Sequence, residues 1–310
     1  MEFLPVNQDD LIERGWDELD IIIVSGDAYV DHPAWAAAIL GRFLEHQGYR
    51  VGIISQPEWR SLNDIRKLGQ PRLMFAISAG NMDSMVNHYT ADKKKRREDL
   101  YSPGGKTGRR PDRATIVYSN LIRQAYPGVP IVIGGVEASL RRLAHYDYWS
   151  DQVRRSILVD SKADLLVYGM GEYNLGEIAR RLKSGQNIAY MHKLRGTCYI
   201  SKNLPEQVVE LPSFEETSEN KQAFARATKI IQSSINPYSA ETLTQKHGDR
   251  WVVQNPPSLP LSAAQLDEIY ELPFSRRCHP MYEDKGGVPG LAPVQFSIVT
   301  HRGCFGGCAF

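Results

Sequence analysis

The chain has 310 residues and carries 37 Lys and Arg against 36 Asp and Glu, so its formal net charge is +1 at pH 7. This balance excludes a global electrostatic bias toward nucleic acid or acidic lipid. Four cysteines are too few for a disulfide framework, and the longest apolar run, residues 34–40, is too short to span a bilayer. The acidic N-terminus lacks the order of a signal peptide, so we expect a cytoplasmic protein without a membrane partner.

The N-terminal part of the chain alternates between apolar runs and amphipathic stretches. Residues 19–24 contain I-I-I-V, a run typical of a strand that is covered on both faces. Asp31 or His32 is expected to cap the helix that follows. Residues 50–55 return as a second strand, which completes a βαβ unit and predicts a parallel sheet.

The same alternation continues to residue 187. Further strands are expected at 72–78, 130–133 and 164–168, and helices at 61–68, 115–126 and from 172 onward. Five strands with intervening helices predict an open, doubly wound, mainly parallel α/β sheet of the flavodoxin-like kind, which we assign to a domain at 1–187. In such sheets the ligand lies beyond the carboxyl ends of the strands.

Glycine-rich and polar turns follow three of these strands and are the expected edges of a cofactor pocket. The residues are Ser25, Gly26, Asp27, Gly134, Gly135, Gly169, Gly171 and Glu172. Each glycine on its own is explained at least as well by a tight strand-to-helix turn. The sequence lacks a G-x-G-x-x-G after the first strand and has no P-loop motif, which argues against dinucleotide and P-loop sites.

Two charged segments interrupt this pattern. Residues 92–113 hold nine Lys and Arg against four Asp and Glu, but Tyr101 is the only aromatic side chain among them, so a base-stacking set is missing. We expect a solvated, mobile loop or a barrel-facing flap there, with contact to nucleic acid as the alternative. The second segment is a polar-aromatic patch after Gly135 that forms either a pocket wall or a surface helix with its aromatics packed inward. It comprises Arg141, Arg142, His145, Tyr146, Asp147, Tyr148, Trp149 and Asp151.

From residue 188 the alternation breaks, and residues 188–293 are interpreted as an α+β connector. We expect β segments at 188–200, 208–211 and 250–253, and a long polar helix at 214–234. After a proline-rich linker, Ser262 and Gln265 form a capping box that opens a short helix.

The last fourteen residues read S-I-V-T-H-R-G-C-F-G-G-C-A-F. The β-branched run at 297–300 predicts a buried strand, followed by a loop that holds Cys304 and Cys308. Closely spaced thiolates on one loop can face one iron–sulfur cluster. Ordinary thiols or half of a zinc site are the alternatives, although zinc needs a second pair, and Cys198 and Cys278 are isolated from each other.

This ending resembles the radical S-adenosylmethionine (SAM) superfamily, whose cluster loop reads C-x3-C-x-Φ-C after the first strand of a partial (β/α) barrel. Cys304 and Cys308 match the first two ligands, and Phe310 matches the aromatic position, where it would shield the cluster. The third ligand would lie beyond the chain, so we expect the chain alone to bind the cluster poorly and to be inactive. The resemblance implies a [4Fe-4S] cluster that binds SAM and cleaves it to a 5′-deoxyadenosyl radical.

Longer phrases, among them S-G-D-A-Y-V-D-H-P and T-H-R-G-C-F-G-G-C, resemble the YgiQ family of long bacterial radical SAM proteins. The resemblance implies that residues 294–310 open a radical SAM domain. It also implies a reductant such as flavodoxin or ferredoxin, while the substrate stays unknown.

The predicted sheet resembles the cobalamin-binding-type domain that precedes the barrel in one class of radical SAM enzymes. Its D-x-H-x-x-G motif is missing here, because His32 follows Asp31 directly. Cobalamin is therefore not favoured, and loss of the cofactor with retention of the fold is the preferred interpretation. The alternative to an enzyme is a non-catalytic binding module for a corrinoid, a nucleotide or a protein partner.

Overall fold

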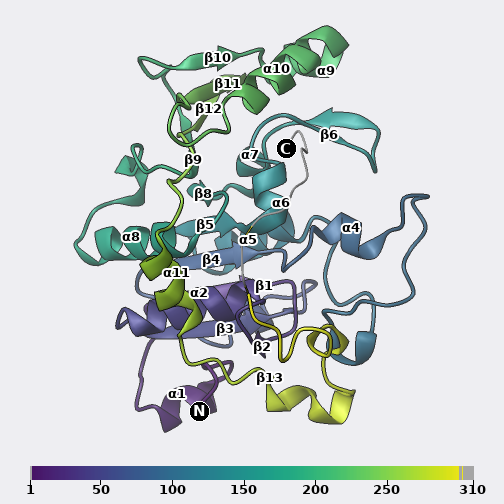
Figure 1. The fold of residues 1–310 in the computed structure, drawn as a ribbon, viewed down its shortest axis with the longest axis vertical. Coiled ribbons are helices and arrows are strands. Elements are labelled where there is room, and N and C mark those ends of the chain that lie inside the picture. Colours follow the sequence, from purple (N-terminus) through teal and green to yellow (C-terminus); the bar gives the residue numbers. More distant parts are fainter. Residues whose placement is uncertain (1, 300–301, 303–310) are drawn as a thin grey trace.

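The fold was examined in a computed structural model that describes residues 2–299 and 302. Over these residues the main sheet has nine strands in the order β10-β11-β12-β9-β8-β5-β4-β1-β3 (Figure 1). Their bounds are β1 (Ile21–Ser25), β3 (Val51–Ser55), β4 (Met74–Ser78), β5 (Ile131–Gly134), β8 (Leu165–Val167), β9 (Thr197–Ser201), β10 (Val209–Leu211), β11 (Leu243–His247) and β12 (Arg250–Gln254). The predicted α/β fold with a large, mainly parallel sheet is confirmed.

The N-terminal half of this sheet is parallel. Strands β3, β1, β4, β5 and β8 lie side by side in that order and run in one direction. Numbered along the chain, this is the order 2-1-3-4-5 of doubly wound sheets. Every residue of β1 is buried, and its side chains alternate between two cores, Ile21 and Ile23 on one face and Ile22 and Val24 on the other. The β-branched run therefore serves both faces of the sheet.

Helices cover both faces of the parallel half. One face packs against α2 (Ala36–His46) and α8 (Glu172–Lys183). The other packs against α3 (Asn63–Arg66), α5 (Ala114–Ala125), α6 (Gly135–Leu140) and α7 (Ile157–Ser161). Each helix in the described part of the chain is too short or too polar to span a bilayer.

The connector strands β9 to β12 extend the same sheet beyond β8. Strand β9 runs antiparallel to β8 and to β12, and β11 is an additional strand that pairs with β12. Only Thr197–Ser201 of the expected 188–200 segment is a strand, and Ile188–Tyr190 (η2) is a 3-10 turn. Residues 188–293 therefore do not fold on a sheet of their own.

The helix expected at 214–234 is two helices, α9 (Phe214–Glu219) and α10 (Lys221–Ser233). The break lies at Asn220, whose side chain accepts hydrogen bonds from the backbone N–H groups of Gln222 and Ala223 and so caps α10. The capping box at Ser262 and Gln265 is confirmed at the start of α11 (Ala263–Tyr270).

Smaller elements decorate this framework. They are α1 (Gln8–Glu13), β2 (Val30–Asp31), α4 (Ser84–His88), η1 (Pro103–Gly105), the hairpin β6 (His145–Asp147) and β7 (Gln152–Arg154), β13 (Arg277–Cys278), η3 (Pro280–Lys285) and η4 (Pro289–Leu291). The strand expected at 297–300 is not formed at residues 297–299, and Thr300 lies outside the described residues.

The start of α2 corrects another prediction, because neither Asp31 nor His32 caps the helix. Trp35 occupies the N-cap position without a side-chain hydrogen bond. The Asp31 carboxylate is instead fully buried and accepts hydrogen bonds from the guanidinium of Arg42, at 3.0 and 2.8 Å, and from the N–H of Ser275, at 2.9 Å. Next to this contact β13 pairs with β2, so the ion pair fastens the segment that leads to the C-terminus onto the β1–α2 connection.

Replacing Asp31 with Ala is expected to lower the free energy of unfolding by up to about 3–5 kcal/mol, because the buried Arg42 would keep only Glu45 as a carboxylate partner and the N–H of Ser275 would lose its acceptor. Urea denaturation measures the loss. The matched control is Glu58→Ala, which removes a carboxylate from the exposed pair with Arg60 and should cost at most about 1 kcal/mol. Equal losses in the two variants would contradict the assigned role of Asp31.

Candidate functional site

A cavity of about 220 Å³ lies at the carboxyl edge of β1, β4, β5 and β8, beside α2 and the start of α8. Six of the expected pocket residues line it, brought together from three strand ends: Ser25, Gly134, Gly135, Gly169, Gly171 and Glu172. Small side chains, among them Ala36, Ala37 and Ala76, form much of the remaining wall. The cavity is thus a narrow, mainly apolar slot with few polar groups at its rim.

Gly26 and Asp27, which were expected at the same edge, do not line the cavity. A Cβ atom at Gly26 would lie 2.0 Å from the carbonyl oxygen of Ala79, so the turns after β1 and β4 touch through their backbones. The Asp27 carboxylate accepts a 2.6 Å hydrogen bond from the N–H of Asn81. Both residues therefore hold the two turns together behind the cavity.

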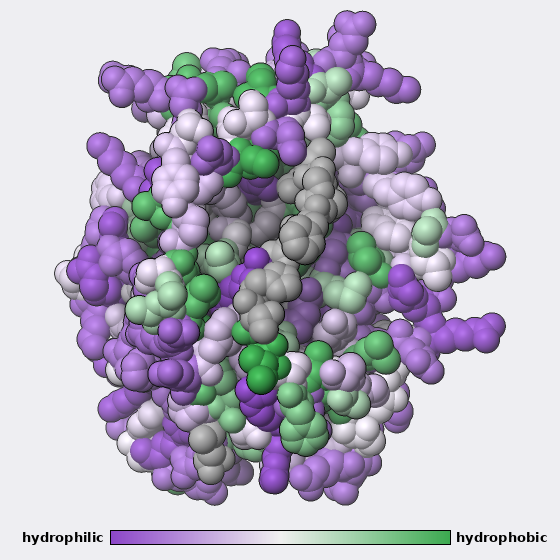
Figure 2. All heavy atoms as spheres, viewed as in Figure 1, coloured by the Kyte–Doolittle hydropathy of each residue, from purple (hydrophilic) through white to green (hydrophobic). Residues whose placement is uncertain are grey.

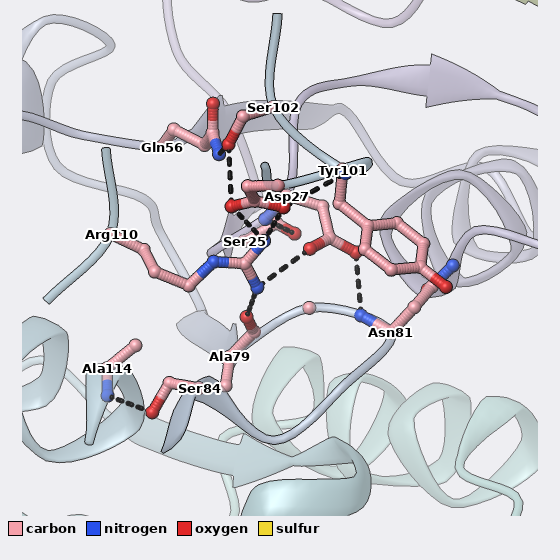
Figure 3. Close-up of polar contacts among 12 residues, drawn as sticks. Ser25, Asp27, Gln56, Ala79, Asn81, Ser84, Tyr101, Ser102, Arg110 and Ala114 are labelled. Atoms are coloured by element: carbon pink, nitrogen blue, oxygen red, sulfur yellow. Dashed lines mark hydrogen bonds and ion pairs between the residues drawn. The ribbon is translucent and has the colours of Figure 1, made fainter. Parts of the chain in front are cut away.

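Arg110 joins Asp27 to the basic segment and is 2% exposed (Figure 3). Its Nη1 lies 3.0 Å from Asp27 Oδ1 and donates a 2.9 Å hydrogen bond to the carbonyl of Ala79, and its Nη2 donates to Asp99 at 3.1 Å. Nearby, the N–H of Ala28 donates to the carbonyl of Tyr101 at 2.9 Å. The expectation of a solvated, mobile loop is therefore wrong for the stretches around Asp99 and Arg110, which are anchored in the protein interior, whereas residues 93–98 and 106–109 are exposed.

The Asp27 carboxyl is fully enclosed in this cluster. Burial raises the pKa of Asp27 to about 6, although the Arg110 charge and the Asn81 N–H act in the opposite direction. Because Asp27 shares the Arg110 guanidinium with a second carboxylate, that of Asp99, the positive charge offsets only part of the effect of burial on its pKa. This environment assigns Asp27 a structural role at the edge of the sheet.

Glu172 and Arg302 close one side of the cavity. Glu172 begins α8 and is 4% exposed, and its Oε1 lies 2.5 Å from Nη1 of Arg302. The Nε of Arg302 donates a 2.6 Å hydrogen bond to the hydroxyl of Tyr270 on α11. The other Glu172 oxygen, Oε2, is buried and has no hydrogen-bond partner within the described residues, so it can accept a bond from a ligand. Sequence reasoning missed Arg302 and Tyr270, and the position of Arg302 two residues before Cys304 was the only available signal.

The predicted metal ligands Cys304 and Cys308, and Phe310 beside them, lie outside the described residues. Cys198 is buried in β9, and burial raises the pKa of its thiol to about 12. Cys278 lies in β13 and packs against the core on the other face of the main sheet. These two thiols therefore do not form the second pair that a zinc site would need, and the described residues contain no group of three or more metal-binding side chains.

The polar-aromatic patch forms the wall of a separate hollow of about 650 Å³, and not of this cavity or a surface helix. Its residues follow α6 and form the β6–β7 hairpin, and all of them except Asp151 line that hollow together with α4 and α10. Arg141 forms an ion pair with Asp83 at the start of α4, which ties this hairpin region to the turn after β4.

Comparison with known proteins identifies the family. Residues 3–297 match the family described as Radical SAM N-terminal. UPF0313 proteins of Clostridium botulinum (strain Kyoto) and Thermotoga neapolitana are 55% and 54% identical over 100% and 99% of this chain. The chain belongs to the YgiQ family of radical SAM proteins. It spans about half the length of these YgiQ-family relatives, 48% of the first and 54% of the second.

Among solved structures, the YgiQ-family chain is similar to the radical SAM methyltransferase TsrM from Kitasatospora setae. The TM-score is 0.39 and the identity 18%, over 58% of this chain and 28% of TsrM. TsrM has been solved with its tryptophan substrate and a SAM analogue, and also with cobalamin and a [4Fe-4S] cluster. These ligands were bound to TsrM, not to the present chain.

A Gly26→Ala variant tests the contact between the two turns behind the cavity. The added methyl group would overlap a backbone carbonyl that cannot rotate away, so the free energy of unfolding should fall by about 1–3 kcal/mol or more. The matched control is Gly171→Ala on the cavity wall, where the new Cβ would lie 3.4 Å from Val167 and should cost less than about 1 kcal/mol. Thermal and urea unfolding measure both, and a Gly26→Ala protein as stable as the control would contradict the proposed packing.

Proposed function

We propose that the full-length protein is a radical SAM iron–sulfur enzyme in which Cys304 and Cys308 supply two thiolates to a [4Fe-4S] cluster that binds SAM. The observation that carries this proposal is the position of Arg302, which is held by Glu172 and Tyr270 beside the sheet-edge cavity. Membership of the YgiQ family and the C-x3-C spacing support the same assignment. The substrate stays open.

Chain geometry relates the predicted cluster loop to the cavity. Cys304 follows Arg302 by two residues, so covalent bonds keep its Cα within about 7 Å of the Cα of Arg302. Arg302 contributes to the cavity wall, and its partner Glu172 is buried while Arg302 itself is partly buried. We therefore propose that the cluster loop begins at the carboxyl edge of the sheet, where a doubly wound fold presents its ligands.

The residues of this chain fit such a role by positioning and shielding. Soft thiolates are the ligands that iron–sulfur clusters take, and Phe310 would shield the cluster from solvent. When bound and reduced, by a donor such as flavodoxin or ferredoxin, the cluster supplies the electron that cleaves SAM to a 5′-deoxyadenosyl radical. Glu172 would hold Arg302 in place through Oε1 and keep Oε2 as an acceptor for a donor group of a ligand in the cavity.

A corrinoid fits the cavity poorly. Its volume of about 220 Å³ is below the range of roughly 300–1,000 Å³ that is usual for sites of drug-sized ligands, and a corrinoid is larger than those. No histidine lines the cavity among the described residues, and His32 is buried elsewhere, with Nδ1 accepting a hydrogen bond from the N–H of Ala34. The proposal therefore includes no cobalamin. A non-catalytic module that binds a nucleotide or a protein partner is the alternative. The observation in its favour is Glu172 Oε2, which has no hydrogen-bond partner among residues 2–299 and 302.

Anaerobic reconstitution of the full-length protein tests the proposal. The protein should turn brown, hold about four iron atoms per chain, and convert SAM to 5′-deoxyadenosine and methionine after reduction. Cys304→Ala and Cys308→Ala should each lose iron and SAM cleavage, because a thiolate ligand is removed. Cys278→Ala is the matched control and should keep both. A folded full-length protein that stays colourless and free of iron would leave only the binding module.

A further inference from the structure

Two segments that are far apart in the sequence meet beside α4 and form what we call the basic-aromatic surface. Its members are Tyr89, Lys93, Lys94, Lys95, Arg96, Arg97, Tyr148 and Trp149. The chain folds back after α4, so that Tyr89 forms a β-bridge with Lys95. The hydroxyl of Tyr148 donates a 2.6 Å hydrogen bond to the carbonyl of Ala91 and fastens the β6–β7 hairpin to this turn. Figure 2 shows hydrophilic side chains projecting on the side where Figure 1 has α4 and the loop after it.

The structure supplies the aromatic set that the basic run lacks in sequence. The ring centroids of Tyr89 and Trp149 are 5.3 Å apart, and those of Tyr148 and Trp149 are also 5.3 Å apart. Tyr148 is 47% exposed, and the Lys93 ammonium lies 4.7 Å from its ring centroid. All three rings line the hollow of about 650 Å³ together with Arg96. A flat partner can therefore stack on aromatic faces that have a cation beside them.

The positive charge of this surface is not compensated. Lys93, Lys94, Lys95, Arg96 and Arg97 are all exposed, and within the described residues none of them has a carboxylate within 4 Å. Four of these five cations, all except Lys93, line a second hollow of about 740 Å³, and Arg96 lines both hollows.

Most of the other charged groups that line the first hollow are neutralised, whereas Arg142 donates hydrogen bonds to the Gln254 amide oxygen and the Ser139 carbonyl instead of a carboxylate. Arg141 is paired with Asp83, and Asp147 is paired with Arg113. Burial lowers the pKa of His145 to about 4, so this imidazole is uncharged at neutral pH. Arg96 is held in place because its Nε donates to the carbonyls of Val86 and Tyr89. The surface thus combines aromatic rings with five cations that have no carboxylate partner among the described residues.

We propose that the basic-aromatic surface binds a segment of single-stranded nucleic acid. Bases of an unpaired strand would stack on Tyr148 and Trp149, while phosphates would lie along Lys94, Lys95 and Arg97. A duplex keeps its bases stacked internally and would use only the charges, and an acidic peptide would gain nothing from stacked rings. Strand binding at this surface does not require the cluster, so either proposal can fail while the other holds.

The test is fluorescence anisotropy with the full-length protein and labelled oligonucleotides of about 12 residues, within the usual site size of single-strand binders. Single-stranded RNA, the same sequence in DNA, and the duplex are compared at low and moderate salt. The single strands should bind more tightly than the duplex, and binding should weaken as salt rises because counterions are released. Tighter binding of RNA than of DNA would identify the natural strand as RNA.

Variants separate stacking from charge. Tyr148→Ala and Trp149→Ala should each weaken single-strand binding about tenfold or more and leave duplex binding unchanged, because one stacking contact is lost. Lys94→Glu together with Lys95→Glu should weaken binding to both and flatten the salt dependence. The matched controls are Trp59→Ala and Lys183→Glu, which change the same residue types on other elements and should bind as the original protein does.

Several outcomes would overturn the proposal. They are no binding of any single strand, unchanged single-strand binding in a folded Tyr148→Ala protein, or polyglutamate competing as well as a single-stranded oligonucleotide does. Tyr148 is half exposed, so Tyr148→Ala is expected to fold. This variant alone decides the test if Trp149→Ala fails to fold.

Discussion

The edge of the sheet depends on one buried guanidinium, that of Arg110, held between Asp27 and Asp99. Removing these three groups from water costs several kcal/mol per ion, and only their close pairing and the hydrogen bonds around them offset that cost. The same side chain donates to the carbonyl of Ala79, so it joins the turn after β1, the turn after β4 and the 92–113 segment. The exposed basic run, residues 93–97, ends two residues before Asp99 of this cluster. A single ionic cluster therefore fixes both the back of the cavity and the base of the basic-aromatic surface.

Patterns that depend on local chemistry could be predicted from the sequence. The β-branched run of β1 predicted a strand covered on both faces, and the capping box at Ser262 predicted the start of α11. The six cavity residues were found because the carboxyl ends of parallel strands share one edge. Features that depend on distant partners could not be predicted. Nothing local shows that Arg110, among nine basic residues, is the one that is buried, or that β9 would pair with β8 so that β9 to β12 continue the main sheet.

The site shows the same division. Glu172 was expected at the pocket edge because it follows a strand and a glycine turn, but its partner Arg302 comes from a segment 130 residues later in the chain. The predicted lack of stacking residues in the basic run was correct for that run alone. The structure brings Tyr148 and Trp149 to it from the β6–β7 hairpin, which lies beyond the reach of any argument from sequence spacing.

The doubly wound topology explains why these features gather in one region. The segment with α4 and the basic run leaves the carboxyl end of β4, and α6 with the β6–β7 hairpin leaves the carboxyl end of β5. The ion pair between Asp83 and Arg141 joins these two excursions at their roots. The cavity lies at the same strand ends from which the loops of the basic-aromatic surface leave, as expected where loops carry function and the sheet holds them in position.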